Sequence, residues 1–200
     1  TMLNRDIYNK APKENRLVNN GVAEVSEDHS EAAQAILRYE LETFVCDGQY
    51  EKGLETILDK FLVNLDAGTE QPGVWISGFY GSGKSHLAKM LRTLWTDYQF
   101  ADGATARSLA KLPIGVFEHL KELSMQGRRH GTLHAAAGKL GAGAGDKVRL
   151  ALLGIVFKSK GLPEQYNQAQ FVLWMTREGI LPTVEAELKS AGRSLAQELP

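Results

Sequence analysis

Hydrophobic side chains recur at helical spacing through most of this sequence. A helix capped by Ser26 to Asp28 is expected to run to about Val45, with its apolar residues on one face. Asp47-Gly48 ends it, and a second amphipathic stripe predicts a helix over residues 49–65. Apolar spacing predicts further helices over residues 86–95, 113–126, 164–179 and 182–198.

Two short runs have the composition of strands instead. Val74-Trp75-Ile76-Ser77 is a β-branched and aromatic run that follows the turn signal Pro72-Gly73, and residues 131–137 form the second run. Strands among helices predict an α/β fold. We expect a P-loop NTPase core with a mainly parallel sheet, preceded by N-terminal helices and followed by a C-terminal helical segment.

This pattern divides the chain into three regions. Residues 1–28 are polar and irregular and form an N-terminal arm. Residues 29–160 form the N-terminal part of the P-loop domain, and residues 161–200 begin a further helical subdomain. We expect the chain to be the N-terminal piece of a longer protein.

The run from Gly78 to Ser85 reads G-x-x-x-x-G-K-S, the phosphate-binding P-loop motif. Its predicted context of strand, glycine loop and helix is the one that the motif requires. Glycines let the backbone wrap closely around phosphate oxygens, and the N-terminus of the following helix attracts their negative charge. The predicted ATP-binding residues are Gly78, Gly81, Ser82, Gly83, Lys84, Ser85 and His86.

Two side chains of this motif have defined chemical roles. Lys84 is expected to reach the β- and γ-phosphates, and Ser85 to give its hydroxyl to Mg²⁺. Phe79 and Tyr80 lie inside the loop, where they either pack beside it or face a partner subunit.

An acidic residue at the end of a second strand, which hydrolysis requires, is not evident. Glu118 is the nearest match, but a helix is expected there, and the apolar run 150–157 leads into Lys158. We therefore expect no catalytic residue within these 200 residues. The alternatives are an ATPase completed elsewhere, a nucleotide-gated assembly module, or a P-loop kinase, for which no arginine-rich lid is recognised.

Composition favours a soluble cytoplasmic protein. The sequence has 23 Lys and Arg against 24 Asp and Glu, one cysteine, and no apolar run long enough for a membrane span. Basic residues outnumber acidic ones over residues 121–160, which indicates either a solvated surface or a nucleic-acid contact. The glycine-rich run 138–145 is either a flexible loop or a second phosphate contact.

Three segments resemble one family. Residues 15–22, the aromatic P-loop with His86-Leu87 (residues 73–87), and residues 136–146 are similar to the N-terminal region of the BrxC/PglY family. These are large P-loop ATPases, thought to be of the AAA+ type, from BREX bacteriophage-exclusion systems.

The resemblance implies a function and partners. It implies an ATP- and Mg²⁺-dependent protein that acts with a methyltransferase, a phosphatase-like protein and other BREX components to modify host DNA and block phage. DNA itself and further copies of the chain are candidate partners. By order alone, residues 15–22 would lie against the adenine, with Leu17 and Val18 as apolar contacts, or would form a surface arm.

Overall fold

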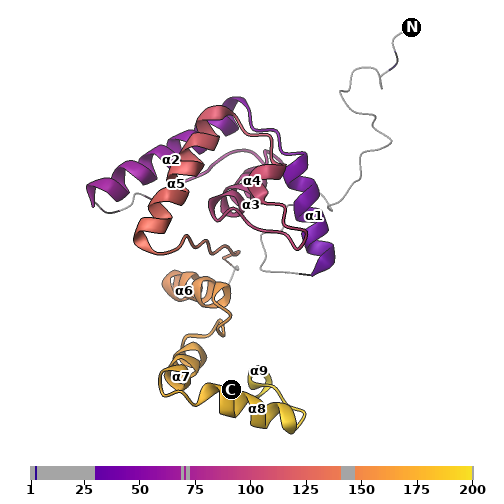
Figure 1. The fold of residues 1–200 in the computed structure, drawn as a ribbon, viewed down its shortest axis with the longest axis vertical. Helices are drawn as coiled ribbons and strands as arrows, with labels where there is room; N and C mark the ends of the chain where they lie inside the picture. Colours follow the sequence, from indigo (N-terminus) through magenta and orange to yellow (C-terminus); the bar gives the residue numbers. More distant parts are fainter. Residues whose placement is uncertain (1–2, 4–29, 69, 71–72, 141–146, 200) are drawn as a thin grey trace. The chain divides into compact units, whose positions relative to one another are not determined.

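The computed structural model describes residues 3, 30–68, 70, 73–140 and 147–199. The described residues form two compact units, one within residues 30–133 and one within residues 134–199 (Figure 1). Their secondary structure is helical: α1 (Glu31–Glu42), α2 (Gly48–Ala67), α3 (Lys84–Trp95), α4 (Ala106–Leu109), α5 (Ile114–His130), α6 (Val148–Ser159), α7 (Tyr166–Arg177), α8 (Leu181–Ser190) and α9 (Leu195–Glu198).

Local sequence signals explain where the first two helices begin and end. Ser30 caps α1, because its side chain accepts a hydrogen bond from the backbone N–H of Ala33 at 3.3 Å. The predicted cap at residues 26–28 lies outside the described residues. Helix α2 ends at Gly68, whose left-handed conformation lets its N–H reach the last carbonyls of the helix.

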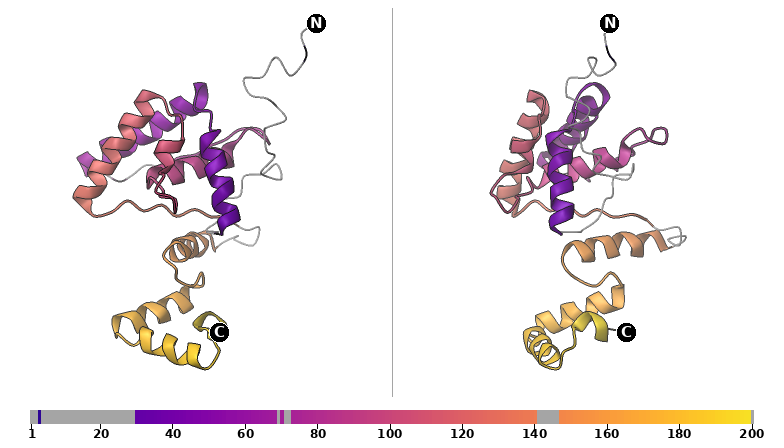
Figure 2. Two further views of the ribbon diagram at one scale, coloured as in Figure 1. Left: turned by 45° about the vertical axis from the view of Figure 1, so that its right-hand side comes forward. Right: turned by 90° about the vertical axis from the view of Figure 1, so that its right-hand side faces the viewer.

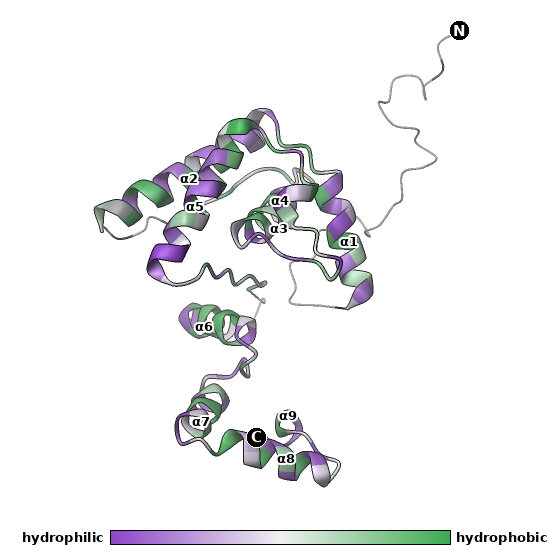
Figure 3. Ribbon diagram, viewed as in Figure 1, coloured by the Kyte–Doolittle hydropathy of each residue, from purple (hydrophilic) through white to green (hydrophobic). Residues whose placement is uncertain are grey.

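The first unit has one hydrophobic core, formed by α1 to α5. Helices α2 and α5 lie side by side (Figures 1 and 2), and α3 packs against α5. Hydrophilic and hydrophobic residues are interspersed along α2 and α5 (Figure 3), and the hydrophobic residues at helical spacing are the ones that are buried. The largest of its fully buried side chains are Leu41, Leu54, Leu58, Met90, Leu94, Val116, Leu120 and Leu123.

The prediction of an α/β fold with a parallel sheet is wrong. The described residues contain no sheet, only an isolated antiparallel bridge between Gln99 and Thr105. Both predicted strands, Val74–Ser77 and residues 131–137, lack strand pairing. A strand is defined by hydrogen bonds to a neighbour, so β-branched composition alone does not make one.

The second unit is a series of short helices with a small core. Phe157 of α6 and Ala169, Val172 and Met175 of α7 are its buried apolar residues. Helix α6 is apolar along most of its length (Figure 3) and coincides with the run 150–157, which therefore is a helix and not a strand.

The lengths of the helices and the environment of the cysteine bear on two of the sequence predictions. Among the described residues, every helix is either too short or too polar to span a lipid bilayer. The single cysteine, Cys46, is buried in the first unit, and this burial raises the pKa of its thiol to about 11.

Candidate phosphate-binding loop

The loop from Gly78 to Ser85 leads directly into α3, as the motif requires. Gly81 and Gly83 have φ angles of 78° and 80°, in the left-handed region that favours glycine. The N–H of Ser82 donates to the carbonyl of Phe79 at 3.2 Å and closes a tight turn. A Cβ added at Gly78 would lie 2.7 Å from the Ser82 hydroxyl oxygen, so the loop is compact on its inner side.

Lys84 is the first residue of α3, and its side chain folds back over the loop. Its Nζ donates to the carbonyls of Gly78 at 2.9 Å and Phe79 at 2.7 Å, and it lies 3.5 Å from the Ser82 hydroxyl. The acceptors are neutral carbonyls, so an anionic phosphate oxygen at the same place would add a direct attraction between opposite charges.

Ser85 and His86 point to different surroundings. Ser85 is exposed in the first turn of α3, beside Lys84. The half-buried ring of His86 lies edge-on to Phe44, with 5.7 Å between ring centroids. Burial lowers the pKa of His86, with Glu40 raising it less strongly and Lys89 lowering it. His86 therefore packs against the core residue Phe44.

Tyr50 anchors the loop, and the sequence analysis missed it. Its hydroxyl, carried by α2, donates to the carbonyl of Ser82 at 2.8 Å. The two residues are 32 positions apart in the sequence, and no local pattern marks the pair. Tyr50 also lies behind Gly83, where an added Cβ would collide with its hydroxyl.

A cavity of about 640 Å³ adjoins the loop, within the range typical of small-molecule sites. One wall is α2 and the other is the extended segment 74–79, and its charged lining residues are Lys52 and Lys84. The cavity is lined by Gln49, Tyr50, Lys52, Gly53, Thr56, Ile57, Val74, Trp75, Ile76, Ser77, Gly78, Phe79, Ser82, Lys84 and Leu87.

A buried ion pair fixes α3 to α1 behind the loop. Lys89 Nζ lies 2.5 Å from Oε2 of Glu40, and the Glu40 side chain is only 5% exposed. Within the described residues, neither carboxylate oxygen of Glu40 receives a well-formed hydrogen bond. The pair therefore acts mainly through charge.

The remaining sequence candidates lie elsewhere. Glu118 is on the exposed face of α5 and pairs with Lys121 at 3.2 Å, as a surface residue does. Residues 15–22, with Leu17 and Val18, and residues 141–146 of the second glycine-rich run lie outside the described residues. In the described part of the chain, no three His, Cys, Asp or Glu side chains cluster as a metal site would require.

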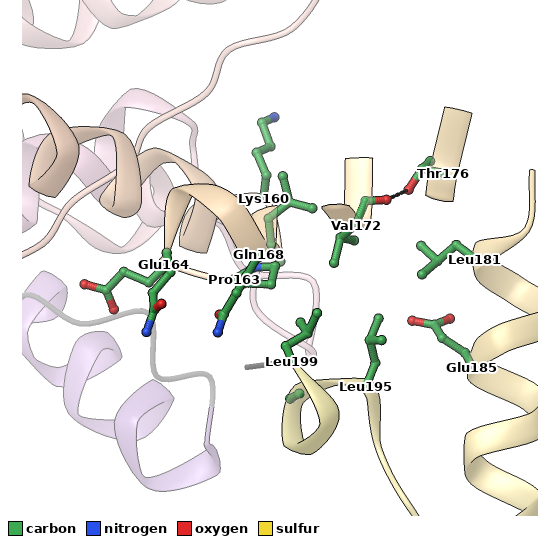
Figure 4. A pocket seen from close by; sticks show the side chains of 14 residues that line it. Lys160, Pro163, Glu164, Gln168, Val172, Thr176, Leu181, Glu185, Leu195 and Leu199 are labelled. Carbon is green, nitrogen blue, oxygen red and sulfur yellow. Dashed lines mark hydrogen bonds between the residues drawn. The ribbon is translucent and has the colours of Figure 1, made fainter. Parts of the chain in front are cut away.

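A larger cavity of about 890 Å³ lies in the second unit, and none of the predicted site residues lines it. Val172 of α7, Leu181 of α8 and Leu195 of α9 face it (Figure 4). Its charged lining residues are one basic residue, Lys160, and two acidic residues, Glu164 and Glu185. Its lysine, Lys160, is accompanied by two carboxylates, and its described lining residues include no glycine-rich phosphate-binding motif.

No protein-family model, curated protein or solved structure matches the chain.

Proposed function

We propose that residues 78–85 bind the triphosphate of ATP–Mg²⁺. The observation that carries this proposal is the position of Lys84, which begins α3 and holds its ammonium over the loop on two backbone carbonyls. Gly81, Ser82 and Gly83 supply the cradle, and the N-terminus of α3 adds its positive dipole. Ser85, beside Lys84, would supply a hydroxyl to Mg²⁺.

The wider role in this proposal comes from the sequence resemblance. The chain would be the ATP-binding N-terminal region of a large BREX ATPase, which couples ATP binding and hydrolysis to DNA modification and phage restriction. Its partners would be the methyltransferase, the phosphatase-like protein and other BREX components, with DNA and further copies of the chain as candidates. This role places the protein in the cytoplasm, where ATP and Mg²⁺ are abundant.

A second candidate function is a nucleotide-gated assembly module with little hydrolysis. The charged side chains that line the cavity, Lys52 and Lys84, are both positive. Positive groups favour the binding of a triphosphate, whereas hydrolysis also needs a group that orients the attacking water. The lining as described suits binding better than turnover.

The test is calorimetric titration with ATP and Mg²⁺ of the wild type, Lys84→Ala and the control Lys111→Ala, which removes an exposed lysine remote from the loop motif. Losing a charge-assisted hydrogen bond costs about 1.5–3 kcal/mol, so Lys84→Ala should weaken binding about ten- to a hundredfold. Lys111→Ala should bind normally. The absence of saturable binding by folded wild type would refute the proposal.

Phosphate release by the same protein tests the gated module. We expect this chain alone to hydrolyse ATP slowly, as both the gated module and an ATPase completed elsewhere require. Rapid ATP hydrolysis that is lost in Lys84→Ala would show that hydrolysis needs no residue outside this chain. It would also reject the gated module.

A further inference from the structure

Two aromatic side chains that line the cavity, one just before the loop and one within it, are almost completely exposed. Trp75 is 90% and Phe79 is 91% exposed, and both line the 640 Å³ cavity. Large apolar side chains gathered on a surface commonly mark a binding site. Aromatic rings next to a lysine-lined phosphate cradle suit a ligand that has one flat face and one anionic end.

The cavity has two chemically different ends. At one end Tyr50 contacts Ser82 and lies near Lys84, where the phosphates are proposed to bind. Ile57 lies seven residues further along α2, which at 1.5 Å per residue is roughly 10 Å away. This distance is comparable with the separation of the base and the phosphates in an extended nucleotide.

Gly53 keeps the middle of this cavity open. It lies inside α2, where glycine costs about 1 kcal/mol relative to alanine. A Cβ added there would meet no atom within 4 Å, so packing within the protein does not require a glycine. The open space lies along the cavity wall between Tyr50 and Ile57. A flat ring has room against this part of the helix.

We propose that the base of the bound nucleotide stacks on Trp75 and packs against the Gly53–Ile57 face of α2. This inference rests on the proposed function, because it assigns the base of the same nucleotide whose phosphates bind at Lys84. The ligand class is then a nucleoside triphosphate, since an inorganic polyphosphate would leave the apolar end of the cavity unused.

The experiment compares ATP with inorganic tripolyphosphate, each with Mg²⁺, on the whole chain. Base–aromatic stacking predicts that wild type binds ATP about five- to a hundredfold more tightly than tripolyphosphate. Trp75→Ala and Gly53→Leu should each remove this preference and leave tripolyphosphate affinity unchanged. Trp75 is exposed and leucine favours helices more than glycine does, so both variants should fold.

Two controls make the result specific. Trp174→Ala removes a partly exposed tryptophan of the second unit, and Val63→Leu enlarges an exposed side chain of α2 outside the cavity. Both should keep the preference for ATP. In wild type, ATP should change tryptophan fluorescence and tripolyphosphate should not, and Trp75→Phe should abolish the change.

The possible failures are separable. Equal affinity for ATP and tripolyphosphate, both weakened by Lys84→Ala, would overturn the base site and leave the phosphate site standing. A preference for ATP that survives both Trp75→Ala and Gly53→Leu would also overturn the base site. The exposed aromatic side chains would then be assigned to a contact with another protein. Binding of neither ligand would reject the proposed function together with this inference.

Discussion

The guanidinium of Arg107 joins the end of one helix to the middle of another. It donates to the carbonyls of Leu94 at 2.8 Å and Trp95 at 3.0 Å, the last residues of α3. It also donates to the carbonyl of Leu120 and the hydroxyl of Ser124, both on α5, at 2.8 and 2.7 Å. Burial lowers the pKa of this group. Its donors reach Leu94 and Trp95 at the C-terminal end of α3, where Leu94 also accepts from the N–H of Asp97 at 3.2 Å.

Replacing Arg107 should destabilise the first unit strongly. Arg107→Met would remove the donor to the carbonyl of Trp95 and the hydrogen bonds that join α3 to α5, and we expect a loss of about 1–3 kcal/mol in the free energy of unfolding. Arg107→Lys should recover only part of this loss, because an ammonium lacks the planar fork of donors. Urea denaturation provides the measurement. Lys111→Ala, at an exposed site, serves as the control and should cost little stability. An Arg107→Met variant that loses no more stability than this control would contradict the stabilising role of Arg107.

His86 should make stability depend on pH. Because burial lowers its pKa in the folded protein, the unfolded chain binds the proton more readily. The contribution is fully present above the ordinary histidine pKa of about 6.5 and is lost as the pH falls through the lower folded value. Urea denaturation of wild type between pH 7.5 and 5.5 should show this loss, and His86→Gln should reduce it. The exposed His130→Gln should retain it, whereas an unchanged slope in His86→Gln would exclude His86 as the cause.

At the scale of elements, helical periodicity located most of the helices. The predicted helices over 49–65 and 113–126 correspond to α2 and α5, each longer by a few residues. Those over 86–95 and 164–179 correspond to α3 and α7. The short helix α4 was missed, although Thr105 and Ser108 form a capping box around it. Four residues are too few to show a hydrophobic period, so only the cap could have revealed it.

Local composition could not decide whether a sheet forms. Val74, Trp75 and Ile76 have strand-forming side chains, but a strand also needs a partner at the correct distance in space. The loop motif was recognisable because its glycines and lysine act locally. The contacts of Tyr50 with the loop and of Glu40 with α3 join distant segments, so they required the structure.

The ion pair between Glu40 and Lys89 should be costly to break from one side. Glu40→Gln would leave the mostly buried ammonium of Lys89 without its counter-charge, and we expect a loss of about 3 kcal/mol. Replacing both residues with methionine should be close to neutral, since no unpaired charge remains. Urea denaturation of wild type, Glu40→Met, Lys89→Met and the double methionine variant forms a double-mutant cycle that measures the interaction between the two residues. The exposed pair Glu118–Lys121 is the control, where Glu118→Gln should cost less than about 1 kcal/mol.

At the scale of the whole molecule, the two units differ greatly in their cores. The core of the first unit draws on five helices and includes Leu41, Leu58 and Leu120. The second unit buries Phe157, Ala169, Val172 and Met175, and leaves Leu150 and other apolar residues of α6 about half exposed. Buried apolar area is the main source of stability, so the first unit should be the more stable one.

This difference predicts that the first unit folds and binds nucleotide alone. The loop, Tyr50, the cavity and the core that supports them all lie within residues 30–133. A chain ending at Leu133 should therefore keep the ATP affinity of the full chain and unfold in one cooperative transition. Calorimetry of the full chain should show a second transition at lower temperature, from residues 134–199. If the shortened chain binds ATP more weakly, or unfolds without cooperativity, the second unit contributes to the site and the two units are not energetically independent.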